Sequence, residues 1–153
     1  MRISKKSEYA LRAMINIGMN ESRNIFNVAQ ISKEENIPEK FLEQILLLLK
    51  KAGFLNSKRG VGGGYLLVKP LKEIRVGQII RLMDGPLAPI TCVSQTAYGR
   101  CSCPDEKTCG LRLVMLDVRN SLSALLDNFT IADIVYSVGK KNMETITGLS
   151  FDI

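Results

Sequence analysis

The sequence contains no histidine. Histidine is the side chain that most often serves as a general base near neutral pH, and it activates the serine or cysteine nucleophile of many hydrolases. No Ser-His or Cys-His catalytic pair can therefore be assembled within this chain. We expect a protein that is not an enzyme and that has no small-molecule substrate.

Long apolar runs are also lacking. The longest is Ile45 to Leu49, whereas a membrane-spanning helix needs roughly 20 apolar residues. The opening M-R-I-S-K-K-S-E-Y-A has neither the apolar segment nor the cleavage pattern of a secretory signal. We therefore expect a cytoplasmic protein without a membrane partner. A chain of 153 residues suffices for one domain, with or without an appendage.

Acidic residues are few in the first half of the chain. Residues 1–81 carry 15 lysines and arginines against 7 aspartates and glutamates, whereas residues 82–153 carry 6 against 8. The net charge of +6 thus arises in the first half alone. A one-sided basic lobe attracts a phosphate backbone, because each neutralised phosphate releases counterions. A lysine-rich surface exposed to water would explain the charge equally well.

What the sequence does contain is apolar residues at helical spacing. This periodicity predicts helices over residues 4–20, 28–35, 38–52, 76–83, 111–129 and 131–138. Asn27 with Gln30 three residues later is typical of a helix start, and Pro38 suits a first helical position. Strands are expected at 54–57 and 65–68, around a glycine-rich turn. The predicted fold is mainly α with a small β-hairpin: a winged helix-turn-helix followed by a long helix.

The helix over 38–52 is the candidate recognition helix. Near its start, Lys40 can reach a guanine or a phosphate, Gln44 can pair with adenine, and Glu43 can accept a hydrogen bond from cytosine. An ordinary helix face exposed to water would look the same. The hairpin turn then carries Lys58 and Arg59, followed by Gly60. Arg59 is placed to enter a minor groove, whereas the order of residues in a nucleotide-binding P-loop is absent.

The helix over 111–129 carries a heptad seam. Leu111, Met115, Val118, Leu122, Leu125 and Phe129 are four or three residues apart, as in helices that pack against a partner helix. A helix inside the core of one chain and a helix that forms a dimer both fit this pattern.

All four cysteines lie in one loop, at Cys92, Cys101, Cys103 and Cys109. The loop has very few other apolar residues, so a bound metal or cluster is the simplest way to order it. Disulfides fit poorly with a cytoplasmic protein. A single zinc ion usually takes two closely spaced pairs of ligands, whereas an iron-sulfur cluster accepts uneven spacing because its irons lie apart. We expect an iron-sulfur cluster, with zinc as the alternative.

Several stretches of the chain resemble the bacterial Rrf-two (Rrf2) family of winged-helix regulators. They are M-R-I-S-K-K-S-E-Y-A-L-R-A-M, F-L-E-Q-I-L-L-L-L-K-K-A-G-F-L, R-G-V-G-G-G-Y-L-L, and the cysteine loop before a long helix. The resemblance covers about residues 1–138. It implies a homodimer with crossed long helices, bound to a palindromic operator in double-stranded DNA. It also implies a cluster, held by three cysteines of the loop, that alters DNA affinity.

The resemblance assigns roles to individual residues. Cys92 matches the family's first cysteine ligand and Cys109 the last. Cys103 precedes Cys109 by the number of residues that usually separates the last two ligands. Cys101 is an additional cysteine, which serves either as a fourth ligand or in place of Cys103. Some members use a histidine after the last cysteine, where this chain has Arg112. Others take a carboxylate from the partner subunit's first helix, where this chain has Glu8. The cluster type, 2Fe-2S or 4Fe-4S, therefore stays open.

The DNA contacts implied by the resemblance are Lys40, Glu43, Gln44 and Arg59, with Lys5 and Tyr9 placed to touch phosphate. We expect a transcription regulator, a repressor, that senses iron-sulfur status, redox state or nitric oxide. A zinc-stapled protein-binding module and a small iron-sulfur electron carrier are the alternatives. The expected division is residues 1–83 for DNA binding, 84–110 for the cluster loop, 111–139 for dimerisation and a short closing helix, and 140–153 as a loosely held tail.

Overall fold

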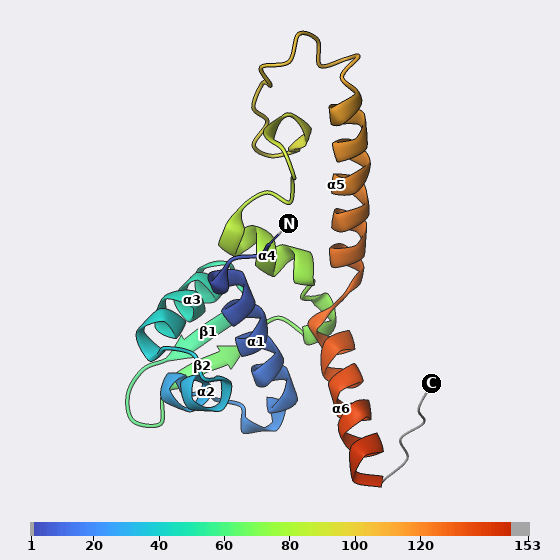
Figure 1. The fold of residues 1–153 in the computed structure, drawn as a ribbon. Helices are drawn as coiled ribbons and strands as arrows, with labels where there is room; N and C mark the ends of the chain where they lie inside the picture. The colour runs from blue at the N-terminus through green and yellow to red at the C-terminus, as the bar shows by residue number, and fades with distance from the viewer. Residues whose placement is uncertain (1, 148–153) are drawn as a thin grey trace.

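The computed structural model describes residues 2–147 of the chain. The elements in chain order are α1 (Lys5–Met19), η1 (Glu21–Arg23), α2 (Val28–Glu35), α3 (Glu39–Lys51), β1 (Leu55–Lys58), β2 (Gly64–Leu67), η2 (Leu71–Glu73), α4 (Val76–Asp84), η3 (Thr91–Val93), α5 (Gly110–Asn128) and α6 (Ile131–Thr147). Helices α1 to α4 and the hairpin form a lobe, from which α5 projects, while α6 runs beside α1 (Figure 1). Within residues 2–147, no helix combines the length and the apolar character needed to cross a membrane.

Local signals set the ends of the helix-turn-helix. The Asn27 side chain accepts hydrogen bonds from two backbone N–H groups of the first turn of α2, at 2.8 and 3.4 Å, as an N-cap should. Gln30 does not complete a capping box; its amide NH2 group donates to Glu34. Asn36 adopts a left-handed conformation at the end of α2, with φ of 51°, and Pro38 stands at the N-cap position, directly before the first residue of α3.

The core of the lobe lies between α1 and α3. Met14 and Ile17 from α1 and Leu42 and Ile45 from α3 are fully buried, as their helical spacing predicts. Phe41, which the same pattern assigns to the core, is 37% exposed. It lies one position outside the buried stripe of α3, so the prediction for this residue is wrong.

The hairpin is a two-stranded antiparallel sheet in which Leu55 pairs with Leu67 and Lys58 with Gly64. Gly60 and Gly62 in the turn have positive φ, a conformation that favours glycine. The hairpin is tied to the helices by Phe26, whose backbone exchanges two hydrogen bonds with Tyr65, at 2.8 and 2.9 Å. The expected winged helix-turn-helix is confirmed.

Helix α5 joins the lobe only near its C-terminal end. There Leu126 packs against a small cluster of Val76, Ile80 and Leu87. No residue of α5 is buried, so the alternative of an internal core helix does not hold for this chain. The seam of α5 remains exposed along most of its length.

Helix α6 is longer than the sequence predicted. Thr130 and Asp133 cap its start, with the Asp133 carboxylate accepting from the Thr130 N–H at 2.8 Å. The helix then continues to Thr147 instead of ending near residue 138, because a single Gly139 in good helix-forming surroundings does not stop a helix. Residues 148–153 of the expected tail lie outside the described residues. The domain boundaries themselves stay predictions.

Candidate DNA interface and cysteine loop

The start of α3 presents a polar face. Lys40, Glu43 and Gln44 are all exposed, as expected for residues that reach into a groove. Beside them, the Phe41 ring meets Tyr9 of α1 edge-on, with ring centroids 5.7 Å apart. This contact brings the start of α1 next to the start of α3. The half-exposed Phe41 therefore belongs to this face and not to the core.

The start of α1 carries its own charges onto this face. Lys5 Nζ lies 2.8 Å from the Glu8 carboxylate and 5.7 Å from the centre of the Tyr9 ring. Arg12 lies over the same ring at 5.5 Å. The hydrogen bond from Lys5 is the largest of the effects that lower the pKa of Glu8, so this carboxylate is ionised and engaged within its own helix.

The wing is the hairpin of β1 and β2 with the turn between them, and it follows α3 in the chain. Lys58, Arg59 and Gly60 are exposed at the hairpin turn. Burial raises the pKa of Tyr65 in β2, and the nearby charge of Glu43 raises it further, which puts α3 beside the wing. The structure thus places the start of α1 against the start of α3, and β2 of the hairpin beside α3. The predicted contact residues on these elements are Lys5, Tyr9, Lys40, Glu43, Gln44, Lys58, Arg59 and Gly60.

The cysteine loop lies on the other side of the molecule from the wing. In Figure 1 it leaves the end of α4, passes alongside the first turns of α5 and closes beyond them. Its first part is anchored: Cys92 and Val93 in η3 are buried, and Arg119 of α5 donates to the Val93 carbonyl at 2.6 Å. The loop therefore flanks α5.

Three of the thiols gather in the second part of the loop. The backbone N–H of Cys103 donates to Cys101 Sγ at 3.0 Å. Hydrogen bonding with the Cys101 thiol, burial and the Cys109 thiol raise the pKa of Cys103 to about 12. All four cysteines are free. Within the described residues, no three His, Cys, Asp or Glu side chains are arranged as a ready site for a metal ion.

Cys92 lies in η3, the anchored first part of the loop, and its thiol interacts with that of Cys101. Burial raises the pKa of its thiol, and Cys101 and Glu106 nearby add to that rise. Cys101 is thus near both Cys92 and Cys103. Pairwise interactions therefore link Cys92 to Cys101, and Cys103 to both Cys101 and Cys109.

Glu106 holds the loop together and was not foreseen from the sequence. Its carboxylate accepts a hydrogen bond from the Cys101 N–H at 2.8 Å and another from the Tyr98 hydroxyl at 2.8 Å. The bond from Cys101 is the largest cause of its lowered pKa. A carboxylate between Asp105 and Lys107 gives no sequence signal of this role, because the role depends on how the loop folds.

The thiols fit an iron-sulfur cluster or zinc by their chemistry. Four soft sulfur donors suit either group. A further observation points to a missing acceptor: Arg112 Nε, in the first turn of α5, is buried and has no hydrogen-bond partner. Buried donors are nearly always paired. A negatively charged group bound among the thiols would explain this unpaired donor.

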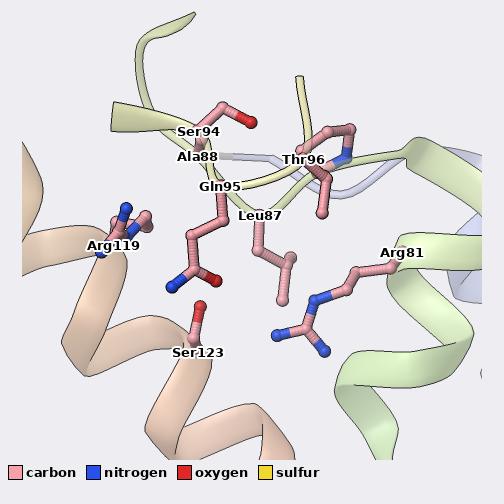
Figure 2. A pocket seen from close by; sticks show the side chains of 9 residues that line it. Arg81, Leu87, Ala88, Ser94, Gln95, Thr96, Arg119 and Ser123 are labelled. Carbon is pink, nitrogen blue, oxygen red and sulfur yellow. The ribbon is translucent and has the colours of Figure 1, made fainter. Parts of the chain in front are cut away.

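A small polar cavity lies where the loop meets α4 and α5. Figure 2 shows Arg81 reaching across from α4, Leu87 between the helices, and Gln95 pointing from the loop towards Ser123 of α5. Arg81 forms a two-pronged ion pair with Asp127, at 2.6 and 2.8 Å. The cavity holds about 30 Å³, room for water but not for an organic ligand. Its lining residues come from α4, the loop and α5.

A larger apolar groove runs along the exposed side of α5. It encloses about 460 Å³. Its lining consists of Val114, Asp117, Val118, Ser121, Leu122 and Leu125. Leu111 and Leu125 in the same seam are 60% and 56% exposed. Contiguous apolar surface of this kind marks an interaction site.

A helix-turn-helix with an exposed polar recognition face, followed by a hairpin with two cations in its turn, defines a winged-helix DNA-binding protein. Comparison with known proteins gives the family. The Rrf2 model, described as an iron-dependent transcriptional regulator, matches residues 3–137. The chain belongs to the Rrf2 family. It is thus a transcriptional regulator and not an enzyme.

Individual relatives cover nearly the whole chain. An rrf2-like HTH-type transcriptional regulator of Rhodobacter capsulatus is 36% identical over 137 residues, which is 87% of this chain and 91% of the relative. The HTH-type transcriptional regulator IscR of Escherichia coli is 32% identical over 135 residues, 88% of this chain and 80% of its own.

Solved structures agree with this assignment. CymR, the global cysteine regulator of B. subtilis, superposes with a TM-score of 0.74 at 27% identity, covering 90% of this chain and 98% of CymR. IscR of T. potens gives a TM-score of 0.72 at 26% identity, covering 90% and 88%.

Proposed function

We propose that this regulator acts as a homodimer that binds a palindromic operator in double-stranded DNA and represses transcription there. We further propose that it senses iron, redox state or nitric oxide through an iron-sulfur cluster on its cysteine loop. The gathering of Cys103 with Cys101 and Cys109, in a loop with little apolar packing of its own, is the observation that supports the sensing role. A regulator of this kind works in the cytoplasm, where thiols stay reduced.

The DNA contacts are proposed for the shared face of α1, α3 and the wing. Gln44 and Lys40 read base edges in the major groove, and Glu43 selects for cytosine by accepting from its amino group. Arg59 enters the adjacent minor groove, with Lys58 and the Gly60 backbone beside it. Lys5 and Tyr9 at the edge of the face contact phosphate.

Dimerisation is proposed through α5. Its exposed seam and groove offer apolar area that one chain leaves uncovered, and heptad spacing suits an antiparallel or crossed copy of the same helix. Two such chains carry two recognition helices. These must meet half-sites about 34 Å apart, or a multiple of this distance, on one side of the duplex.

Cys92, Cys101, Cys103 and Cys109 are the proposed ligands of a 2Fe-2S or 4Fe-4S cluster. When bound, such a cluster supplies one-electron redox chemistry and a centre that oxygen or nitric oxide can attack. The alternative occupant of the same thiols is zinc. Glu8 of the opposite subunit is a further candidate ligand, although within one chain it pairs with Lys5 and Arg12.

The link between loop and DNA runs through the junction of α4 and α5. Ordering of the loop fixes η3 against α5 through the Arg119 bond to Val93. The Arg81–Asp127 pair and the packing of Leu126 then hold α5 at one angle to the DNA-binding lobe. In a dimer, that angle sets the distance between the two recognition helices.

The test is purification without oxygen, followed by an absorption spectrum and assays for iron, acid-labile sulfide and zinc. We expect iron and sulfide in similar amounts and visible absorption from thiolate-bound iron. Zinc without sulfide would replace the cluster by a structural zinc ion. A colourless, metal-free protein would contradict the sensing role.

Serine variants identify the ligands. Replacing Cys92 or Cys109 by serine should abolish the visible absorption, because each is the first or last thiolate of the set. Comparing Cys101→Ser with Cys103→Ser shows whether both are ligands. If all four variants keep the wild-type iron content, the cluster is not held by this loop.

A further inference from the structure

Arg112 is placed where a cation is unfavourable for the helix itself. It lies in the first turn of α5, three residues after Cys109, and that turn contains no acidic residue. The N-terminal end of a helix carries partial positive charge, so anions are stabilising there and cations are not. The local structure of α5 alone does not account for an arginine at this position.

The surroundings of Arg112 are those of the cysteine loop. Its charge acts on Cys92, on the Tyr98 hydroxyl and on the Glu106 carboxylate, in each case favouring the ionised form. None of these groups accepts a hydrogen bond from Nε, which remains buried and unpaired. A buried guanidinium N–H without an acceptor is costly. The unpaired donor therefore lies beside the cysteine loop, close enough for the Arg112 charge to act on the Cys92 thiol.

A cluster held by thiolates provides such an acceptor. It is an anion in both oxidation states and is more negative after reduction, and its sulfur atoms accept hydrogen bonds. Net charge and hydrogen bonds to the sulfurs are among the factors that set the reduction potential of iron-sulfur centres. A partly buried cation whose N–H group donates to the sulfurs stabilises the reduced form more than the oxidised form, and therefore raises the reduction potential.

We propose that Arg112 is a positioning residue of the cluster site: its Nε–H group donates to a sulfur of the bound cluster or its thiolates, retaining the cluster and raising its reduction potential. This inference rests on the proposed cluster. It does not make Arg112 an iron ligand, because an arginine has no lone pair to offer at neutral pH.

The test compares full-length wild-type protein with Arg112→Gln and Arg112→Lys, all purified without oxygen. The readouts are the midpoint potential in a spectroscopic redox titration and the rate at which a chelator removes iron. Arg112→Gln should shift the midpoint to a more negative potential and should lose iron about 10-fold faster, the lower end of the effect of removing an outer-shell partner from a metal site. Arg112→Lys keeps the charge and should recover part of both changes.

Arg100→Gln is the matched control. Arg100 lies in the same loop beside Cys101 and is exposed, so the variant removes an equal charge without removing a buried donor. It should change the midpoint potential and the rate of iron release clearly less than Arg112→Gln does. If Arg112→Gln melts at the wild-type temperature but loads no cluster, the role of Arg112 in retaining the cluster is supported. If Arg112→Gln does not fold, the comparison of Arg112→Lys with Arg100→Gln tests the inference in its place.

Two results would overturn the inference. If wild type holds a cluster and both Arg112 variants keep its potential and its rate of iron loss, Arg112 has no role towards the cluster, while the proposed function stands. If wild type contains no iron and sulfide, the proposed sensing function fails, and this role of Arg112 fails with it.

Discussion

At the scale of single residues, the face proposed to bind DNA depends on a few exposed side chains around a pair of partly exposed aromatic rings. Tyr9 and Phe41 meet edge-on and fix the start of α1 against the start of α3. The charged groups around them, from Lys5 to Arg59, are exposed and available to a partner. Their contribution to binding is mainly electrostatic and depends on salt.

Arg59→Ala should weaken operator binding by roughly 1–3 kcal/mol and reduce the slope of log K against log salt by about 1, because one groove and phosphate contact is lost. Fluorescence anisotropy at several salt concentrations, with an operator selected from random duplexes, measures both quantities. Lys140→Ala, on α6, is the control and should change neither. An unchanged slope for Arg59→Ala would remove this residue from the interface.

The sequence was informative wherever a local pattern decides the conformation. Asn27, Asn36 and Pro38 mark the ends of α2 and α3, and their chemistry acts within one turn. Phe41 was misplaced, because periodicity cannot tell the edge of an apolar stripe from its centre. Glu106 could not be found at all, since its bonds to Cys101 and Tyr98 depend on a loop conformation that no periodicity encodes.

At the scale of elements, the join between α4 and α5 is the critical contact. Gly77 in α4 leaves room for the Arg81–Asp127 pair: a Cβ at this position would overlap the Asp127 carboxylate and crowd the Arg81 guanidinium. The sequence indicates neither this close approach nor the pair, which joins residues 46 positions apart.

Gly77→Ala should therefore lower the free energy of unfolding by about 1 kcal/mol, because steric overlap outweighs the gain in helix propensity. In Gly139→Ala of α6, the added Cβ meets no atom within 4 Å. This substitution should raise the free energy of unfolding by about 0.5–1 kcal/mol. Urea unfolding of both variants measures the two effects. Equal changes in the same direction would show that Gly77 has no packing role.

The same ion pair predicts a dependence of stability on pH. The hydrogen bond from Arg81 is the largest cause of the lowered pKa of Asp127. The carboxylate thus contributes stability above its ordinary pKa of 3.8, and this contribution is lost as the pH falls through the lower folded value. The pair is partly exposed, so the contribution is at most about 1 kcal/mol. Asp127→Asn should therefore reduce the dependence of the free energy of unfolding on pH in this range. A dependence as steep as that of wild type below pH 4 would show that Asp127 is not the group responsible.

At the scale of the whole molecule, the chain separates a DNA-binding lobe from a cysteine loop and connects them through α5 (Figure 1). The heptad pattern of α5 was visible in the sequence, but its exposure was not, because the same pattern suits a core helix. The extension of α6 to Thr147 was likewise missed. Because the apolar seam of α5 is exposed in the single chain, we expect it to pack against the same helix of a second copy.

Val118→Glu should disrupt the dimer, since it places a carboxylate from each chain in the apolar groove and leaves both without a partner. We expect the dissociation constant to rise roughly 100-fold or more. Asn120→Glu adds the same charge outside the groove lining and should leave the dimer intact. Sedimentation equilibrium distinguishes the two, and a Val118→Glu protein with the mass of two chains would rule out this face of α5.

The central claim is that a cluster on the cysteine loop controls how the two DNA-binding lobes sit on an operator. The most direct measurement is the operator Kd of cluster-loaded and cluster-free protein from one preparation, at one salt concentration and without oxygen. We expect the two Kd values to differ by at least about 5-fold, the lower limit of a typical coupling between two sites. Equal values, with iron and sulfide present in the loaded sample, would contradict it.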